Sequence, residues 1–309
     1  MTGSDAATYG IDIGGTKLLA LRLGGGATVR AASPRRREDV IAAIRNAVSG
    51  SEPVAIGVGV PGLVDTGGVL VSSPHLPGLA GTPLAALVRE AWPDAAVWVG
   101  NDATAAAWAE AAAGAGRGAS DVLTVTLGTG IGGGIVSGGR LQEGARRFAG
   151  EWGHMVVDPH GPPCPCGQRG CWERFASGDG LGRLAREAAY AGRLDLAGGD
   201  PEAVRGEHVT AAAAAGDAGA LAVMQELAWW LALGLANLAN IFDPEVIVLG
   251  GGLVDAGEVL VAPTREVFPR LVHAGDQRDR IRIVPAELGS GAGAVGAALL
   301  ASAMPRSLC

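Results

Sequence analysis

Three of the four cysteines lie in one short segment, residues 149–173, AGEWGHMVVDPHGPPCPCGQRGCWE. Cys164 and Cys166 are separated by a single residue, which is too close for an easy mutual disulfide. Together with Cys171 they place three thiolates on a tight, glycine-rich loop. One added histidine would complete a tetrahedral Cys₃His site with no open position, which is typical of structural zinc. The segment therefore predicts a zinc ion that folds a loop and does not activate water.

Two histidines and two glutamates accompany this loop. His154 and His160 are both candidates for the fourth ligand, and spacing alone leaves both open. Glu151 lies three residues before His154, so on a helical turn the two side chains would share a face. Glu151 and Glu173 flank the loop, where they either bind a ligand or form surface salt bridges. Cys309, at the far end of the chain, has no predicted role.

Two glycine-rich turns could hold phosphate. They are DIGGTK (12–17) and LGTGIGGG (127–134), and each is predicted to connect two strands. Glycine lets backbone N–H groups approach an anion closely, and Thr16 and Thr129 could add hydroxyl donors. Asp12 would hold Mg²⁺ through water. Either turn alone could be an ordinary hairpin, but two at equivalent places favour phosphate binding. The candidate residues are Asp12, Gly14, Gly15, Thr16, Lys17, Gly128, Thr129 and Gly130.

A third glycine run follows the predicted strand of DPEVIVLGGGL (243–253) and precedes a helix. A helix N-terminus attracts the negative charge of a nucleotide phosphate. Gly250 and Gly251 are therefore candidates for the adenosine and α-phosphate end of a nucleotide. A tight strand-to-helix turn is the alternative.

Asn101 and Asp102 stand where a strand becomes a helix in VGNDATAAAWAE. Asp102 could simply cap the helix, since aspartate is a favoured N-cap residue. It could also act as a general base that accepts a proton from a hydroxyl as that hydroxyl attacks a phosphoryl group. Asn101 would then hydrogen-bond neighbouring hydroxyls.

The elements that position these residues form two similar halves. Each half opens with a strand, a glycine turn and a second strand, and then alternates helices and strands, which indicates an internal duplication. Ligands of such paired α/β units bind in the cleft between them. We expect a small domain at 1–117, on which the C-terminal helix at about 291–305 could pack back, and a large domain at 118–290 that carries the zinc loop and the nucleotide site. The predicted strands are 9–13, 54–62, 96–102, 121–128, 245–252 and 280–288, and the predicted helices are 38–49, 82–91, 103–113, 227–242 and 291–305.

Composition narrows the class of protein. The 309 residues are 48% hydrophobic and 18% charged, which indicates a globular chain. The net charge of −7 argues against a nucleic-acid groove. Met1–Thr8 lacks the apolar core of a signal peptide, and the apolar run 227–242 is shorter than the ~20 residues of a membrane span. We therefore expect a cytoplasmic protein with no membrane partner and with reduced cysteines.

Seven motifs, in order over nearly the whole chain, resemble the ROK family (repressors, unknown reading frames and sugar kinases), and its bacterial glucokinases most of all. The resemblance implies the two-domain actin-like/hexokinase (ribonuclease H-like) fold, with a duplicated βββαβαβα core and an interdomain cleft for ATP and sugar. It also implies a homo-oligomer, either a dimer or a tetramer. The first strand begins near Tyr9, so we expect no helix-turn-helix domain of the family's repressors. The motifs are DIGGTK, GVGVPGLVD, ND-x-x-AAA, TLGTGIGGG, AGE-x-GH, C-x-CG-x-x-GC-x-E and NIFDPEVIVLGGG.

The resemblance further implies an activity and its residues. A family kinase of this type would use ATP with Mg²⁺ to phosphorylate the 6-hydroxyl of a hexose, here most simply glucose, with Asp102 as the base. Zinc is implied on His154, Cys164, Cys166 and Cys171. The implied sugar-binding residues are Pro61, Gly62, His75, Asn101, Asp102, Glu151, His154 and Glu173.

Three positions differ from the family's usual motifs around the sugar. His75 and Thr104 each replace an asparagine, and Leu79 replaces a tryptophan. A glucose relative such as mannose, an amino sugar or a cyclitol is therefore an alternative substrate. Polyphosphate is an alternative donor, because the glycine turns are suited to bind phosphate more than the base. A sugar-sensing protein without catalysis is the alternative from another class.

Overall fold

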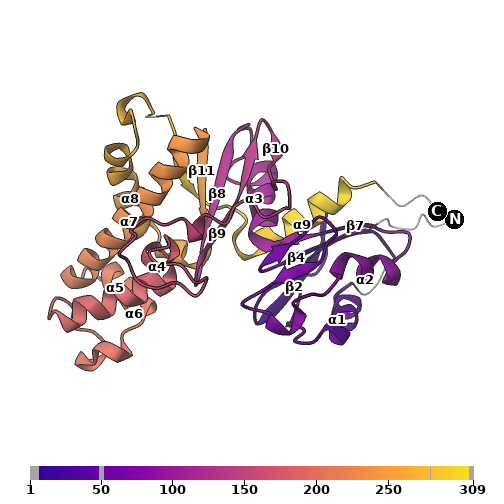
Figure 1. The fold of residues 1–309 in the computed structure, drawn as a ribbon, viewed down its shortest axis with the longest axis horizontal. Coiled ribbons are helices and arrows are strands. Elements are labelled where there is room, and N and C mark those ends of the chain that lie inside the picture. The colour runs from indigo at the N-terminus through magenta and orange to yellow at the C-terminus, as the bar shows by residue number, and fades with distance from the viewer. Residues whose placement is uncertain (1–6, 49–51, 279, 306–309) are drawn as a thin grey trace. The chain divides into compact units, whose positions relative to one another are not determined.

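The computed structural model describes residues 7–48, 52–278 and 280–305 (Figure 1). Most of the short leader segment considered above, as well as Cys309, lies outside these residues. The chain divides into two compact units. The first unit comprises the described residues up to Gly118, then Gly133–Gly150 and the residues from Glu287 onward. The second unit comprises Ala119–Gly132 and Glu151–Ala286.

A five-stranded sheet forms the centre of the first unit, in the order β3-β2-β1-β4-β7. The first three strands are antiparallel neighbours, whereas β4 and β7 run parallel to β1. Near-continuous apolar residues in β4 and β7 fit strands buried on both faces. A two-stranded ribbon follows β4. The bounds are β1 Ala7–Ile13, β2 Lys17–Arg22, β3 Val29–Ala32, β4 Pro53–Val60, β5 Leu63–Val64, β6 Leu70–Ser72 and β7 Ala96–Asn101.

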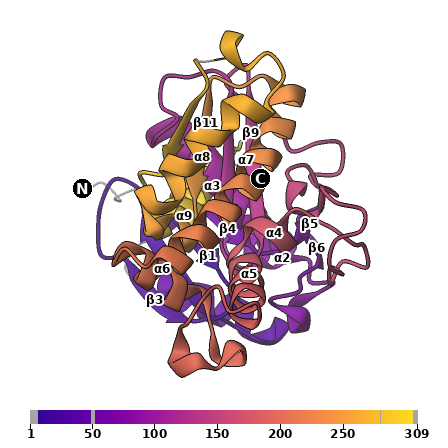
Figure 2. The same ribbon diagram turned by 90° about the vertical axis from the view of Figure 1, so that its left-hand side faces the viewer.

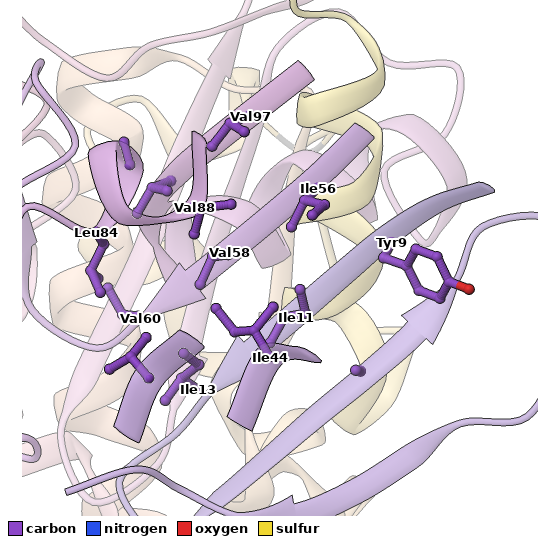
Figure 3. Close-up of a cluster of buried hydrophobic side chains, with 14 of the residues drawn as sticks. Tyr9, Ile11, Ile13, Ile44, Ile56, Val58, Val60, Leu84, Val88 and Val97 are labelled. Carbon is purple, nitrogen blue, oxygen red and sulfur yellow. The ribbon is translucent and has the colours of Figure 1, made fainter. Parts of the chain in front are cut away.

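Helices cover both faces of this sheet. One face packs against α1 (Val40–Ala47) and α2 (Leu84–Ala91) through a cluster of branched side chains, shown in Figure 3. On the other face α9 (Ala292–Ser302) lies so close that a Cβ at Gly57 would come within 1.8 Å of the Ala297 carbonyl oxygen. The helix α3 (Asp102–Ala113) packs against α9. Small residues thus let the final helix of the chain complete the first unit.

The second sheet has the order β10-β9-β8-β11-β12. Its pattern repeats the first sheet, with antiparallel β9 and β10 at one side and parallel strands at the other, as the predicted duplication requires. The bounds are β8 Val122–Leu127, β9 Ile131–Ser137, β10 Arg140–Leu141, β11 Val246–Gly250 and β12 Arg282–Pro285. Strand β9 begins earlier than predicted, so Gly132, Gly133 and Gly134 belong to the strand and not to the turn. A Cβ at Gly134 would lie 2.5 Å from the Ala107 Cβ on α3. Close packing against α3, and not a turn, therefore explains why this position is a glycine.

Five α-helices belong to the second unit (Figures 1 and 2): α4 Glu173–Ala176, α5 Gly178–Tyr190, α6 Gly206–Ala214, α7 Ala218–Phe242 and α8 Glu258–Leu271. Helix α7 packs against α8, α6 and α5. It is longer than the predicted helix 227–242, because it begins at Ala218 after the N-cap Asp217. Among the described residues it is the one helix long and apolar enough to cross a membrane, and half of its most apolar window is buried inside the protein. A core helix of a soluble protein passes the same test.

Short 3₁₀ helices complete the described structure. They are η1 Arg37–Asp39, η2 Pro77–Leu79, η3 Trp152–His154, η4 Ala197–Gly199, η5 Pro201–Ala203, η6 Gly252–Ala256, η7 Gly275–Gln277 and η8 Gly289–Gly291. Two of them matter for the site, since η3 carries His154 and η6 follows the third glycine run.

Candidate functional site

The turn between β1 and β2 is fixed by hydrogen bonds within the turn and from Ser33. The Gly14 amide donates to the Lys17 carbonyl at 3.0 Å, which closes the turn. The Ser33 hydroxyl donates to the Gly14 carbonyl at 2.6 Å, and the Ser33 amide donates to the Thr16 carbonyl at 3.1 Å. These bonds use the carbonyls of the turn. Thr16 and Lys17 are exposed, so the turn presents hydroxyl, ammonium and amide donors outward, as phosphate binding requires.

Asp12, which precedes this turn, has a carboxylate oxygen without a hydrogen-bond partner among the described residues. Its Oδ1 is buried, and no group in the described part of the chain hydrogen-bonds to it. Burial, and after it the nearby charge of Asp102, raises the pKa of Asp12 from 3.8 to about 7. A buried carboxylate oxygen without a partner is a natural ligand for a cation or its water shell. The predicted magnesium role fits this environment.

Asn101, and not Asp102, caps helix α3. The Asn101 Oδ1 accepts the Thr104 amide at 2.9 Å, and its Nδ2 donates to the Gly62 carbonyl at 3.1 Å. The capping alternative considered for Asp102 is therefore wrong, because the cap position falls one residue earlier. Asp102 is the first helical residue, and its carboxylate accepts the adjacent Ala103 amide at 2.8 Å and its own backbone amide.

The surroundings of Asp102 favour a proton acceptor of increased basicity. Burial raises the pKa of Asp102, although hydrogen bonds from backbone amides and the charge of a protonated His75 act in the opposite direction. Gly59 on the neighbouring strand lies beside it, since a Cβ there would be 3.4 Å from the Asp102 Cα, an ordinary van der Waals contact. A general base needs a raised pKa to take a hydroxyl proton effectively near neutral pH.

The three positions that depart from the family pattern lie in different environments. His75 is exposed and its side chain lies beside Gly15 in the β1–β2 turn. Leu79 is completely buried in the core of the first unit, and Thr104 is buried within α3. Pro61 is buried and Gly62 has a φ of 120°, which suits a glycine in a turn. Of the three departures, only His75 presents its side chain to solvent.

The cysteine loop gathers four ligand atoms. The ligand atoms of His154, Cys164, Cys166 and Cys171 all lie within 4.8 Å of one another, and none of these cysteines forms a disulfide. His160 is not a member of this group. Three sulfurs and one nitrogen at this spacing suit a closed tetrahedral zinc site. Burial raises the pKa of the Cys164 thiol, so a bound cation is what would hold it as a thiolate.

Two tryptophans attach this loop to the second unit. The Trp152 Nε1 donates to the Gly132 carbonyl at 3.0 Å, and the Trp172 Nε1 donates to the Trp230 carbonyl on α7 at 2.8 Å. Trp172 is fully buried, and a Cβ at Gly234 would lie within 1.9 Å of its ring. Both ends of the loop are therefore fixed by packing in addition to any metal.

The two glutamates next to the loop both face His154. The His154 Nδ1 lies 3.5 Å from the Glu173 Oε1 and 3.8 Å from the Cys164 sulfur, whereas its Nε2 lies 4.0 Å from the Glu151 Oε2. Nδ1 thus faces the sulfurs and Nε2 faces away from them. The other oxygen of Glu173 accepts the Ile131 amide at 3.4 Å, at the start of β9. Both glutamates therefore belong to this cluster.

A pocket of about 870 Å³ opens in the second unit next to the β8–β9 turn. Gly128 and Thr129 line it, and the Gly178 amide at the start of α5 donates to the Gly128 carbonyl at 2.8 Å. Gly250 and Gly251 do not line it, whereas the next residues along the chain do. Most of the lining comes from α5, α6 and η6, which sequence reasoning did not identify. The polar residues of this lining are Thr129, Arg174, Asp179, Arg186, Arg205, Glu207, Thr210 and Asp255.

Comparison with known proteins establishes the class that this fold and site define. The profile of the ROK family matches residues 8–304, and the chain belongs to this family. It is 39% identical to a glucokinase of Streptomyces coelicolor, over 95% of this chain and 97% of that protein. It is 33% identical to an N-acetylmannosamine kinase of Escherichia coli, over 95% of this chain and 98% of that protein.

A solved structure supports the same assignment. The ROK family glucokinase from Streptomyces griseus, crystallised with glucose and AMPPNP, superposes with a TM-score of 0.83. It is 39% identical and covers 96% of this chain and 99% of that chain. The predicted family and the predicted actin-like, two-domain α/β fold are thereby confirmed.

Proposed function

We propose that this protein is an ATP-dependent glucokinase that transfers the γ-phosphoryl group of ATP to the 6-hydroxyl of glucose. Full-length similarity to glucokinases supports the reaction class. The observation in the chain itself that carries the proposal is Asp102, a buried carboxylate at the start of α3, directly after β7, with its pKa raised by burial. Such a group is what proton abstraction from a sugar hydroxyl requires.

The first unit supplies the base and one phosphate turn. Asp102 accepts the 6-hydroxyl proton as the oxygen attacks the γ-phosphorus. Asn101, held by Gly62, and the adjoining Pro61 orient the sugar. The residues Gly14, Gly15, Thr16 and Lys17 bind phosphate oxygens. Asp12 would hold Mg²⁺ through water, and this ion would neutralise phosphate charge.

The second unit supplies the donor pocket and further sugar contacts. We assign the pocket beside Gly128, Thr129 and Gly130 to ATP. Gly250 ends β11 and Gly251 caps η6, whose residues line the pocket. A Cβ at Gly251 would lie 2.4 Å from the Leu127 carbonyl oxygen, so a glycine there lets β11 pass close to β8.

Sugar hydroxyls are assigned to Glu151, His154 and Glu173 in the second unit. The His154 Nδ1 faces the sulfurs, so it is the nitrogen that would bind zinc, and Nε2 stays available for a sugar hydroxyl. Carboxylates accept hydrogen bonds from hydroxyls in this setting. Zinc would fold the loop, and the folded loop would orient these three side chains.

Steady-state kinetics of purified protein with Asp102→Asn test the catalytic assignment. Wild-type protein should phosphorylate glucose with ATP and Mg²⁺, and Asp102→Asn should lower kcat by about 100-fold or more with an unchanged thermal unfolding curve. Near-normal turnover in the variant would place the base elsewhere. A lack of ATP-dependent turnover by wild-type protein on any hexose tested would refute the kinase itself.

Metal analysis of Cys166→Ser tests the zinc proposal. We expect about one zinc per chain in wild-type protein, loss of that metal in the variant, and a higher KM for glucose. His160→Ala is the matched control, because His160 lies outside the ligand group and should keep both metal and KM. Retained zinc with a normal KM in Cys166→Ser would separate the metal from sugar binding.

An amino-sugar kinase is the second candidate function, favoured by the relative from Escherichia coli. A coupled assay over glucose, mannose, N-acetylmannosamine, glucosamine and inositol ranks these substrates by kcat/KM. Polyphosphate as sole donor is assayed on the same panel. Sugar binding by calorimetry without any transfer would instead indicate a sensor.

The proposal includes a cytoplasmic homo-oligomer. A cluster of reduced cysteines favours the cytoplasm. Three large apolar side chains of α7 are partly exposed, namely Trp229, Ile241 and Phe242, and exposed apolar surface of this kind often marks a subunit contact. Sedimentation velocity of the purified protein would distinguish a monomer from a dimer or a tetramer.

A further inference from the structure

His75 is an exposed side chain on a rigid backbone. The Leu76 amide donates to the Ser73 hydroxyl at 3.1 Å, and Leu76 and Ser73 are both buried. Leu79, three residues beyond Leu76, is also buried. The segment is therefore anchored on the core on both sides of His75. His75 is exposed between these buried residues, so the fold sets where its backbone lies.

The imidazole lies directly over the phosphate turn. A Cβ at Gly15 would lie 3.3 Å from the His75 Cβ, tighter than most real contacts of a Cβ, and 3.9 Å from its Nδ1, an ordinary van der Waals contact. Glycine at this position therefore leaves room both for an anion at the turn and for the histidine beside it. An imidazole beside backbone donors that bind phosphate is placed to add a further donor.

The same histidine is close to the proposed base. The charge of a protonated His75 opposes the effect of burial on Asp102, which requires the two side chains to be near each other. Both residues belong to the first unit. The phosphoryl group must pass between the phosphate turn and the hydroxyl that Asp102 deprotonates. A side chain near both the turn and Asp102 therefore lies beside its path.

We infer that His75 donates a hydrogen bond to a non-bridging oxygen of the phosphoryl group in transit, in place of the sugar contact implied by resemblance. The inference rests on the proposed kinase function. In the step, the 6-hydroxyl oxygen forms a bond to the γ-phosphorus and its proton goes to Asp102. The bond from the γ-phosphorus to the bridging oxygen breaks, and its electron pair leaves with ADP. His75 keeps its proton and stabilises the charge on the phosphoryl oxygens.

Kinetics of three variants test this role. His75→Ala should lower kcat by about 10- to 100-fold and change the KM for glucose less than twofold, because the contact exists in the transition state. His75→Lys keeps a cationic donor and should recover a large part of kcat, whereas His75→Phe should not. His273→Ala is the matched control, since His273 is an exposed histidine of the second unit, away from any assigned site. His75 is exposed, so thermal unfolding should be unchanged in every variant.

Binding of a transition-state mimic gives an independent readout. ADP with Mg²⁺, fluoroaluminate and glucose should bind His75→Ala about 10- to 100-fold more weakly than wild type, while glucose alone binds both equally. A kcat within twofold of wild type, or a rise in the glucose KM with unchanged kcat, would overturn the inference and leave the kinase function intact. An inactive wild-type protein would instead remove the proposed function, and this role with it.

Discussion

The stability of the protein should depend on the ionisation of Asp12. The pKa of this carboxyl is raised from 3.8 to about 7, first by burial and then by the charge of Asp102. The folded state therefore holds a proton that the unfolded state releases between these values. The free energy of unfolding should fall as pH rises through this range and level off above about 7. Below pH 3.8 the carboxyl is protonated in both states, so the free energy of unfolding no longer changes with pH through this group.

The expected size follows from the two pKa values. Each unit of pKa difference corresponds to about 1.4 kcal/mol, so complete ionisation of Asp12 costs about 4 kcal/mol. Integrated from pH 5 to pH 8, the loss is about 2.5 kcal/mol. Asp12→Asn imitates the protonated acid and should lack this loss. Asp102→Asn should reduce the loss without abolishing it, because burial is the larger cause.

Urea unfolding at pH 5 and pH 8 with EDTA measures this difference directly. Other groups titrate too, so the quantity of interest is the change in the stability gap between wild type and Asp12→Asn. Addition of Mg²⁺ at pH 8 should stabilise wild-type protein and not the variant, if Asp12 holds the ion. An identical gap at both pH values would show that Asp12 titrates normally, and the reasoning from its buried oxygen would be refuted.

Three further changes test the packing around the site. Gly57→Ala should destabilise the first unit by about 3 kcal/mol or more in urea unfolding, because its Cβ would collide with the α9 backbone; a stable variant would contradict the close approach. Glu110→Ala should cost about 3 kcal/mol or more, because the buried carboxylate accepts the amides of Ala115, Glu287 and Leu288. A loss below 1 kcal/mol would show that these bonds are replaced by water. Gly234→Ala should displace Trp172 and lower bound zinc, measured by metal analysis; full occupancy would show that the loop folds independently of α7.

Local chemistry was predictable where neighbouring residues carry it. The cysteine loop was recognised because its ligands lie close together in sequence, although spacing could not separate His154 from His160. The choice depends on η3, which turns His154 toward the sulfurs. The predicted strands also agree with the structure in place and order, since buried parallel strands are strongly apolar. Their ends differ by a few residues, because hydrogen bonding, and not composition, determines where a strand begins and ends.

Features made by tertiary packing were not predictable. The donor pocket collects residues of α5, α6 and η6 that no local motif joins. Helix α7 extends nine residues before the apolar run, because the Asp217 cap, and not the first residue of the apolar run, sets where it begins. Likewise Gly134 belongs to a strand, and only the approach of α3 explains why it is a glycine.

The position of α9 in the chain has a consequence for how the protein is made. The first sheet is complete in sequence at Asn101, yet the helix that covers one of its faces spans Ala292–Ser302. During synthesis the strands with Gly10 and Gly57 therefore emerge long before their cover. About 190 residues, which take roughly 10 to 40 s to translate, separate the two events. Over that interval the nascent chain exposes a sheet face that is open to aggregation or to a chaperone. Removing α9 should therefore lower the soluble yield more sharply than removing a surface helix of equal length.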